Sequence, residues 1–259
     1  MIPLADLHSH LVPGVDDGAA SLDEALDSLR HLRAEGVTAL VTTPHLLLPR
    51  LSTDAAIGRE LERHRRAFDL LLDATEGASD LPAVALGQEI WAPDAAAIRR
   101  VASRADVGFG GGDVLLVEFG FVLKGTHEDV IEAARAAGRR IVIAHPERYR
   151  FVSGMDPLET AAAWRGRGAE IQINAGSLTG HYADSAPGSE SLSWRLIDAG
   201  LADLISTDHH GTRREGVSPR EARTALLARN LREAAERLLS TNPGRIVRAA
   251  LESAAIRSA

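Results

Sequence analysis

Residues 136–147 read Ala-Ala-Gly-Arg-Arg-Ile-Val-Ile-Ala-His-Pro-Glu, and this stretch contains the pattern that predicts the fold. A helix that ends at a glycine is followed by a short apolar run, and the run ends in a polar residue. Glycine just past a helix end readily takes the left-handed conformation that closes the last turn. A short apolar run beside it is typical of a strand that is buried on both faces, as in a parallel sheet.

The same step recurs at Gly36, Gly168 and Gly200. Together with the other apolar runs it predicts about seven strands, near residues 2–7, 38–43, 83–89, 114–119, 141–144, 170–174 and 203–207. Strands that alternate with helices indicate a parallel sheet in an α/β fold. An open doubly wound sheet would also fit, but polar residues at nearly every strand end favour a closed barrel, where those ends meet on one face. We expect one domain over residues 1–259, since no shift in composition marks a boundary.

Helix starts are marked by capping residues. Ser21, Thr126 and Ser218 each stand three residues before an acidic residue, which is capping-box spacing or its Asp variant. Asp156 and Asn242 each precede a proline, as an N-cap does when proline occupies the first turn. Two helices carry apolar stripes, formed by Leu22, Leu26, Leu29 and Leu32 and by Ile57, Leu61, Phe68 and Leu72.

Composition narrows the class of protein. The chain has 259 residues, a net charge of -7 and no cysteine, so disulfides and thiolate metal sites are excluded. The acidic balance weighs against a nucleic-acid partner. No apolar run approaches the roughly 20 residues of a membrane helix, so we expect no membrane insertion. Motifs begin at Asp6, which leaves no room for a signal peptide, and we expect a cytoplasmic protein.

Six predicted strand ends carry His, Asp or Glu. In Asp6-Leu7-His8-Ser9-His10 the two histidines lie two apart on a strand, so they point the same way and can hold one metal. Asp208 and His210 share a face in the same manner. The candidate metal ligands are His8, His10, Asp17, His45, Glu89, Glu118, His145, Asp208 and His210.

Each of these residues, taken alone, can be explained without a metal, as a hydrogen-bonded core residue, a surface residue or a partner of an arginine. Chance alone is a poor explanation for polar, potentially metal-binding residues at six strand ends. Without bound cations, the negative charge of the buried carboxylates would also be uncompensated. At roughly three protein ligands for each open metal, nine ligands suit two or three divalent metals. We interpret His31, His64 and His127 as surface residues on helices, expect His209 to point away from its neighbours, and place His181 in a loop.

The order and spacing of these motifs resemble the PHP (polymerase and histidinol phosphatase) superfamily. Within it, the chain is similar to bacterial protein-tyrosine phosphatases of the CpsB/YwqE type, which are enzymes of capsule and exopolysaccharide biosynthesis. The resemblance spans nearly the whole chain. Its most specific segments are Asp6-Leu7-His8-Ser9-His10-Leu11-Val12-Pro13-Gly14-Val15-Asp16-Asp17-Gly18 and Ala144-His145-Pro146-Glu147-Arg148-Tyr149.

The resemblance implies a distorted (β/α)7 TIM-like barrel with a trinuclear site, often manganese, held by the same nine residues. Nitrogen and oxygen ligands suit manganese, iron and zinc alike. The resemblance also implies that Arg148 binds substrate phosphate with help from Arg213 or Arg214. Its substrate would be the phosphotyrosine-bearing tail of a kinase in polysaccharide export.

The expected chemistry is metal-assisted hydrolysis of a phosphomonoester. A hydroxide bridging two metals would attack phosphorus in line, while the metals and Arg148 neutralise charge on the phosphoryl oxygens. Asp208, His210 or a metal-bound water would protonate the leaving phenolate.

Three other functions compete with this hypothesis. The first keeps the chemistry and changes the substrate to histidinol phosphate, another small phosphomonoester or a nucleic-acid end. The second is an amidohydrolase, which also opens with His-x-His, but that class often uses a lysine on its fourth strand. This chain has Glu118 there, and its only lysine, Lys124, lies beyond it. The third is a metal-binding regulator without catalytic activity.

Overall fold

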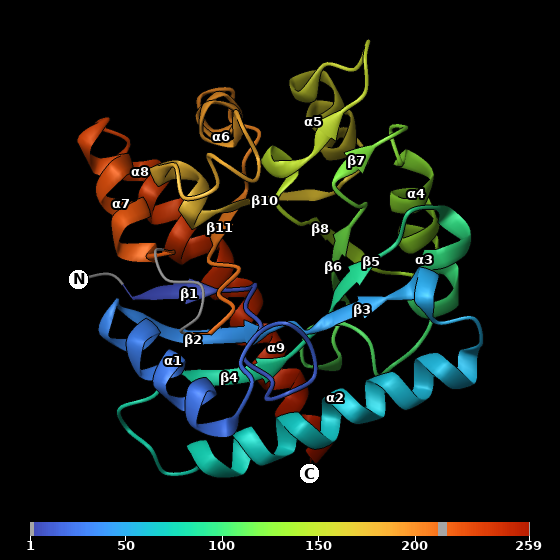
Figure 1. Ribbon diagram of the computed structural model, residues 1–259, viewed down its shortest axis with the longest axis vertical. Helices are drawn as coiled ribbons and strands as arrows, with labels where there is room; N and C mark the ends of the chain where they lie inside the picture. Colours follow the sequence, from blue (N-terminus) through green and yellow to red (C-terminus); the bar gives the residue numbers. More distant parts are fainter. Residues whose placement is uncertain (1–2, 212–216, 259) are drawn as a thin grey trace.

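Parallel strands form the centre of the computed structural model, which describes residues 3–211 and 217–258, and helices surround them (Figure 1). One sheet has the order β1-β2-β4, with β1 at Leu4–Asp6, β2 at Val37–Thr42 and β4 at Ala83–Leu86. The second has the order β11-β10-β8-β6-β5-β3. Its strands are β3 (His45–Leu47), β5 (Glu89–Trp91), β6 (Val114–Glu118), β8 (Arg140–Ile143), β10 (Glu170–Asn174) and β11 (Leu204–Ser206).

The two sheets are continuous because two predicted strands bend without leaving the ring. The strand predicted at 38–43 divides into β2 and β3 at Thr43-Pro44, and the one at 83–89 divides into β4 and β5 at Gly87-Gln88. Backbone hydrogen bonds cross the bend, from Gly87 N to Thr42 O (2.8 Å) and from Glu89 N to Pro44 O (3.1 Å). A Cβ at Gly87 would lie 2.5 Å from the Phe109 ring, so only glycine fits at this bend.

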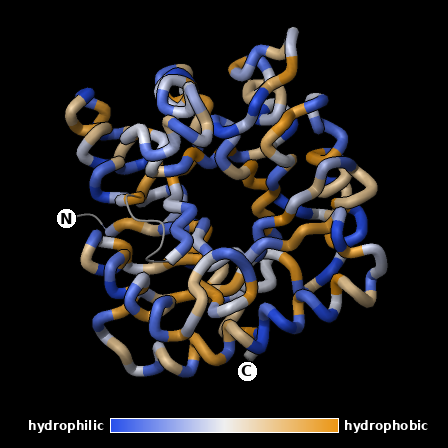
Figure 2. Tube along the Cα trace, in the orientation of Figure 1, coloured by the Kyte–Doolittle hydropathy of each residue, from blue (hydrophilic) through white to orange (hydrophobic). Residues whose placement is uncertain are grey.

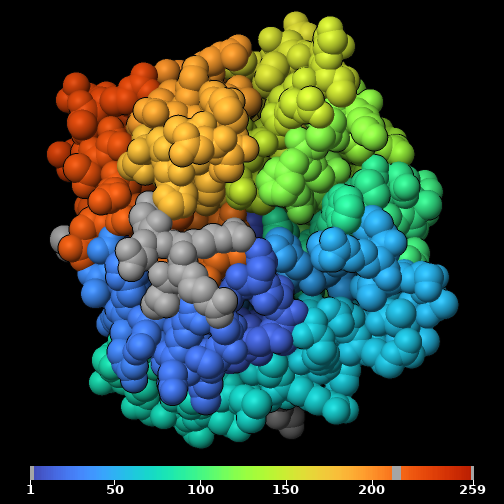
Figure 3. Space-filling view, in the orientation of Figure 1, coloured from blue at the N-terminus to red at the C-terminus, as the bar shows by residue number. Residues whose placement is uncertain are grey.

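The ring closes where the ends of β1 and β11 meet. Asp208 N donates to His8 O (2.8 Å), and His10 N donates to His209 O (2.7 Å). The buried Asp6 carboxylate accepts from Thr207 N (2.9 Å), which ties the same two chain segments. The space-filling view shows blue N-terminal residues beside orange residues of the C-terminal quarter (Figure 3). The predicted seven-stranded α/β barrel is therefore confirmed.

Helices cover the outside of the ring. They are α1 (Leu22–Ala34), α2 (Asp54–Thr75), α3 (Ala95–Ala102), α4 (Glu128–Ala136), α5 (Pro157–Gly166), α6 (Ser189–Asp198), α7 (Pro219–Ala228), α8 (Arg232–Glu236) and α9 (Asn242–Ser258). Short turns are η1 (Leu48–Arg50), η2 (Phe109–Gly111), η3 (Pro146–Arg148), η4 (Ala175–Thr179) and the π-helical η5 (Arg237–Thr241). A two-stranded parallel ribbon, β7 (Val122–Leu123) with β9 (Arg150–Phe151), lies outside the ring.

Two apolar clusters build the core. The larger packs helices on the strands, and the smaller contains apolar side chains of the strands together with Ile246, Val247 and Ala250 of α9. Because α9 packs on β1, β2 and β4 through these residues, the last helix covers one part of the ring. Hydrophilic and hydrophobic residues alternate along the helices, as expected for elements with one buried face (Figure 2). Within the described ranges, no helix combines the length and apolarity that a membrane span requires.

Three of the five predicted caps are confirmed, because the side chains of Ser21, Asp156 and Ser218 accept backbone N–H groups of the first turn. Thr126 was the wrong cap: α4 begins at Glu128, after His127 in a left-handed conformation (φ 50°). Asn242 is also no cap, because its backbone is helical and the chain enters α9 directly from the π-helical turn.

The buried face of α2 differs from its prediction at two positions. Leu72 is 44% exposed, and Leu71 is buried in its place. His64 is completely buried on the same face as Ile57 and Phe68, which contradicts its placement on the surface. His31 lies exposed as predicted. Burial lowers the pKa of His64 to about 4, because charging the ring inside the protein would forfeit its hydration.

His64 should make the fold less stable in mild acid. Its pKa is lowered in the folded protein, so the unfolded chain binds the proton more strongly and stability falls as the pH drops below the unfolded value of about 6.5. Between about pH 7.5 and pH 5 this residue should remove about 2 kcal/mol of unfolding free energy. Denaturant titrations of the wild type and His64→Leu should show that the variant loses this part of the pH dependence, and identical pH profiles would contradict the assignment.

Candidate metal centre

The predicted ligands converge where the strands end around one mouth of the ring. Eight of the nine form three overlapping groups whose donor atoms lie close enough to share an ion. The groups are His8, His10 and Asp208; His10, Asp17, His45 and His210; and His8, Glu89 and His145. The sequence placed these residues at strand ends, except for Asp17 in the loop after the first strand, and the barrel brings them together.

The first group is the tightest. His8 Nε2 and His10 Nε2 lie 3.2 Å apart, and Asp208 Oδ1 lies 3.2 and 3.3 Å from them. Glu89 Oε2 lies 3.5 Å from each ring nitrogen. Donors about 2.1 Å from one metal lie roughly 3.0–3.4 Å from each other in tetrahedral or octahedral geometry. The two ring nitrogens and Asp208 Oδ1 therefore have the spacing of a single coordination shell, and Glu89 Oε2 lies close beside both rings.

The second group is nearer to solvent. Asp17 Oδ1 lies 3.3 Å from His45 Nε2 and 3.5 Å from His210 Nε2. The loop that carries Asp17 folds tightly against His10, and a Cβ at Gly18 would lie 2.0 Å from His10 O. Glycine at this position therefore lets the loop bring Asp17 to the mouth of the barrel.

Glu89 lies between the groups. Its Oε1 is 2.9 Å from His145 Nε2, and its Oε2 is 2.7 Å from His45 Nδ1. Yet neither Glu89 Oε2 nor His45 Nδ1 makes a hydrogen bond with any described residue, although both are buried. The two atoms form a close ion pair whose geometry is not that of a hydrogen bond, and buried polar groups without a hydrogen bond are costly. Nitrogen and carboxylate donors crowded in this way fit bound divalent cations.

The charges of the site depend on one another. Burial alone would raise the pKa of Glu89, but His8 and His45 beside it hold that pKa well below its usual value. Burial also disfavours the charged form of His8, and Glu89 and Asp208 outweigh it and raise the His8 pKa to about 9. Glu89 and Asp208 are therefore ionised and attract positive charge.

Two of the predicted ligands have strained backbones. His145 (φ 32°) and Asp208 (φ 55°) lie in the left-handed region, which non-glycine residues rarely adopt. Conformations of this kind cost on the order of 1–3 kcal/mol each and concentrate at functional sites. The turns at these residues direct both side chains into the cluster.

Glu118 is the predicted ligand that lies outside the three groups. Burial and the neighbouring Glu89 raise its pKa to about 8. Together with Asp17 and His45 it lines a cavity of about 620 Å³ that opens beside the cluster. The structure therefore places Glu118 on the wall of this cavity, next to the grouped donors.

Arg148 lies beside the cluster on η3. Its Nη1 donates to Asp208 Oδ2 (2.7 Å), and its guanidinium carbon lies 4.3 Å from the Tyr182 ring centre and 5.2 Å from that of Phe121. Arg148 Nε is buried and has no acceptor among the described residues. The other predicted phosphate ligands, Arg213 and Arg214, lie outside the described residues.

Sequence reasoning missed the residues that orient the ligands. Asp16 accepts from His10 Nδ1 (2.7 Å) and from the backbone N–H of His45 (3.1 Å). Gln172 Oε1 lies 3.0 Å from His8 Nδ1, and Asn174 Nδ2 donates to Asp208 Oδ2 (2.9 Å). Asp16 was discoverable as the neighbour of Asp17, and the two amides were discoverable as polar residues in the buried strand β10.

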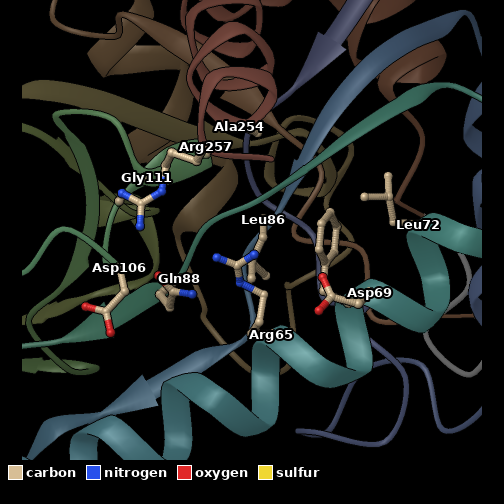
Figure 4. A pocket seen from close by; sticks show the side chains of 12 residues that line it. Arg65, Asp69, Leu72, Leu86, Gln88, Asp106, Gly111, Ala254 and Arg257 are labelled. Atoms are coloured by element: carbon tan, nitrogen blue, oxygen red, sulfur yellow. The ribbon is translucent and has the colours of Figure 1, made fainter. Parts of the chain in front are cut away.

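A second cavity, of about 90 Å³, lies between α2, η2 and α9, and none of the nine predicted ligands lines it (Figure 4). Its wall carries Arg65, Asp69, Asp106 and Arg257, so two cations face two anions. The His/Asp/Glu cluster therefore opens only into the larger of these two cavities.

Comparison with known proteins identifies relatives over nearly the whole length. Residues 4–248 match the family described as capsular polysaccharide synthesis, CpsB/CapC. CapC of Staphylococcus aureus is 29% identical over 208 residues, which cover 80% of this chain and 77% of that protein. Tyrosine-protein phosphatase YwqE of Bacillus subtilis (strain 168) is 27% identical over 225 residues, covering 85% and 82%.

A solved structure supports the same fold. It belongs to crystal structures of YwqE from Bacillus subtilis and CpsB from Streptococcus pneumoniae, described as unique metal-dependent tyrosine phosphatases. It superposes with a TM-score of 0.70 at 24% sequence identity and covers 97% of this chain and 94% of the other. This match confirms the α/β barrel implied by the resemblance.

Removing the Asp16 carboxylate should weaken metal binding without unfolding the protein. Asp16 fixes the tautomer of His10 that presents Nε2 to the cluster, and loss of such an orienting partner typically costs 10- to 100-fold in metal affinity. Competition with a fluorescent chelator should therefore give an Mn²⁺ dissociation constant for Asp16→Ala that is roughly 10- to 100-fold higher than that of the wild type.

The control is Asp27→Ala, because Asp27 is an exposed residue of α1 that pairs with Arg30. It should bind Mn²⁺ as the wild type does. Equal affinity in all three proteins would show that Asp16 does not support the ligands.

Proposed function

Because this chain belongs to the CpsB/CapC family, we propose that it is a metal-dependent phosphomonoesterase that removes phosphate from tyrosine in proteins. One observation carries the proposal: nitrogen and carboxylate donors that could share metal ions converge beside an arginine whose buried Nε–H has no acceptor among the described residues. A cluster of cations next to such an arginine is suited to the negative oxygens of a phosphate.

In this proposal the nine predicted residues hold two or three divalent metals, with manganese as the preferred ion. His8, His10, Glu89 and Asp208 hold one, His45, Asp17 and His210 hold another, and His145 and Glu118 complete the site beside Glu89. When bound, such ions supply an activated water and neutralise the charge of the phosphoryl group.

Arg148 would orient the phosphate. Asp208 accepts a hydrogen bond from Nη1, and the Tyr182 ring packs against one face of the guanidinium. The buried Nε–H has no acceptor among the described residues, which supports an anionic ligand for Arg148. His210 Nδ1 hydrogen-bonds to Asp208 O, so its other nitrogen is unprotonated and suits a ligand better than an acid. A phenolate leaving group, with a pKa of about 10, needs little protonation to depart.

The family description supports a physiological role in capsular polysaccharide synthesis. The substrate we propose is the phosphotyrosine-bearing tail of a kinase in that process. An amidohydrolase fits less well, because the only lysine, Lys124, is exposed and does not line the cavity beside the cluster.

Phosphate release should depend on metal and favour phosphotyrosine. We expect the purified protein to release phosphate from a phosphotyrosine peptide in preference to histidinol phosphate, to lose this activity on chelation, and to regain it with Mn²⁺. Metal content is measured in parallel. Preference for histidinol phosphate would move the protein to another phosphatase class, and activity that survives complete removal of metal would refute the proposal.

Arg148→Ala should lose at least about 100-fold in kcat/KM for the phosphotyrosine peptide, since a charged donor to the phosphoryl group is removed from a buried site. Its metal content should stay close to that of the wild type, because Arg148 is not among the proposed ligands. Arg150→Ala is the matched control, since Arg150 lies two residues further on an exposed position of β9. Loss of activity in both variants would indicate damage to the ribbon instead of a role in phosphate binding.

A further inference from the structure

An aromatic side chain is exposed at the mouth of the candidate site. Phe121 is 53% exposed and lines the cavity of about 620 Å³ together with His45, Asp17 and Glu118. The other large apolar side chains that are exposed in the described part of the chain are aliphatic: Leu70, Leu72, Val122, Val152 and Ile256. None of these five lines that cavity, so Phe121 is the one member of this exposed set, among the described residues, that lies beside the cluster.

The backbone holds Phe121 in this position. Gly120 has a φ of +91°, and a Cβ there would lie 3.1 Å from Trp91 Nε1. Glycine therefore lets the chain turn over the Trp91 indole without the backbone strain that any other residue would carry here. On the other side, Phe121 O accepts a hydrogen bond from Arg150 N (2.8 Å) at the start of the β7–β9 ribbon.

The ring of Phe121 borders the groups that would handle phosphate. It is nearly parallel to the His145 imidazole, with 8° between the planes and 6.1 Å between the ring centres. Its centre lies 5.2 Å from the guanidinium carbon of Arg148. A phosphate bound at Arg148 would therefore place the group on its ester oxygen close to the Phe121 ring.

We infer that Phe121 is a specificity-determining residue that stacks against the aromatic ring of an aryl phosphate. The inference rests on the proposed function for the identity of the substrate. Aromatic rings attract each other at centre distances of about 4.5–7 Å, beyond what buried area alone contributes. The side chain of phosphoserine is too short to reach such a platform while its phosphate is held at Arg148. The cavity is within the size range of ligand sites, about 300–1,000 Å³.

Binding of non-hydrolysable phosphonates to the manganese-loaded protein tests the inference. Benzylphosphonate carries an aromatic ring, cyclohexylmethylphosphonate a saturated ring of similar size, and methylphosphonate no ring. Calorimetry should show that Phe121→Ala binds benzylphosphonate about tenfold more weakly than the wild type, as expected for a lost aromatic pair. Methylphosphonate should bind within about twofold of the wild type, and Phe121→Trp should restore the affinity for benzylphosphonate.

Val122→Ala is the matched control, because Val122 is the next residue, is exposed and does not line the cavity. It should bind all three phosphonates as the wild type does. Equal weakening of benzylphosphonate and methylphosphonate by Phe121→Ala would overturn the inference, because it would show a structural effect on the phosphate site. Unchanged affinity for benzylphosphonate would also overturn it, as would an equal loss for the saturated ring.

Catalysis by the same proteins separates this inference from the proposed function. If the wild type hydrolyses a phosphotyrosine peptide, Phe121→Ala should raise KM for it more than it lowers kcat. A wild type that binds benzylphosphonate through Phe121 but hydrolyses no phosphomonoester would refute the proposed function and leave the ring platform standing. Hydrolysis of the peptide that does not depend on Phe121 would support the proposed function and overturn the role of the Phe121 ring.

Discussion

Closure of the barrel between its first and last strands is the constraint on which the candidate site depends. The backbone hydrogen bonds Asp208 N to His8 O and His10 N to His209 O join segments about 200 residues apart. In an open sheet these two strands would be opposite edges, and His8 and His10 could not approach Asp208. Across the same seam, the buried Asp6 carboxylate accepts a hydrogen bond from Thr207 N–H.

The closed ring forces charges into a small volume. Imidazoles surround Glu89 and Asp208, and Arg148 also pairs with Asp208, so both carboxylates remain ionised. Three ring nitrogens lie within 3.5 Å of Glu89 Oε2. Buried ion pairs are a weak source of stability, because each charge loses its hydration. Left-handed backbones at His145 and Asp208 add strain. The fold therefore retains at this mouth an arrangement that favours ion binding over packing.

Several local features were predictable because they depend on neighbours in the sequence. Ser21, Asp156 and Ser218 cap their helices through hydrogen bonds that span two or three residues, so spacing alone identifies them. The same spacing rule predicted Thr126 as a cap and was wrong there, because His127 takes a left-handed conformation and α4 begins only at Glu128. His64 was misplaced because residue type suggests a surface position, whereas the period of α2 puts it on the buried face between Leu61 and Phe68.

The sequence by itself determined the alternation of strands and helices and the types of residue at the strand ends, since apolar period and turn chemistry are local properties. Only the tertiary structure decided which of these residues share an ion, because the groupings depend on distances across the ring. It also decided the partners that sequence spacing cannot reveal, such as Asp16 with His10 and Arg148 with Phe121 and Tyr182. Contacts of this kind arise from closure of the barrel and from the bends at Thr43-Pro44 and Gly120. The spacing of residues along the chain does not reveal these three features.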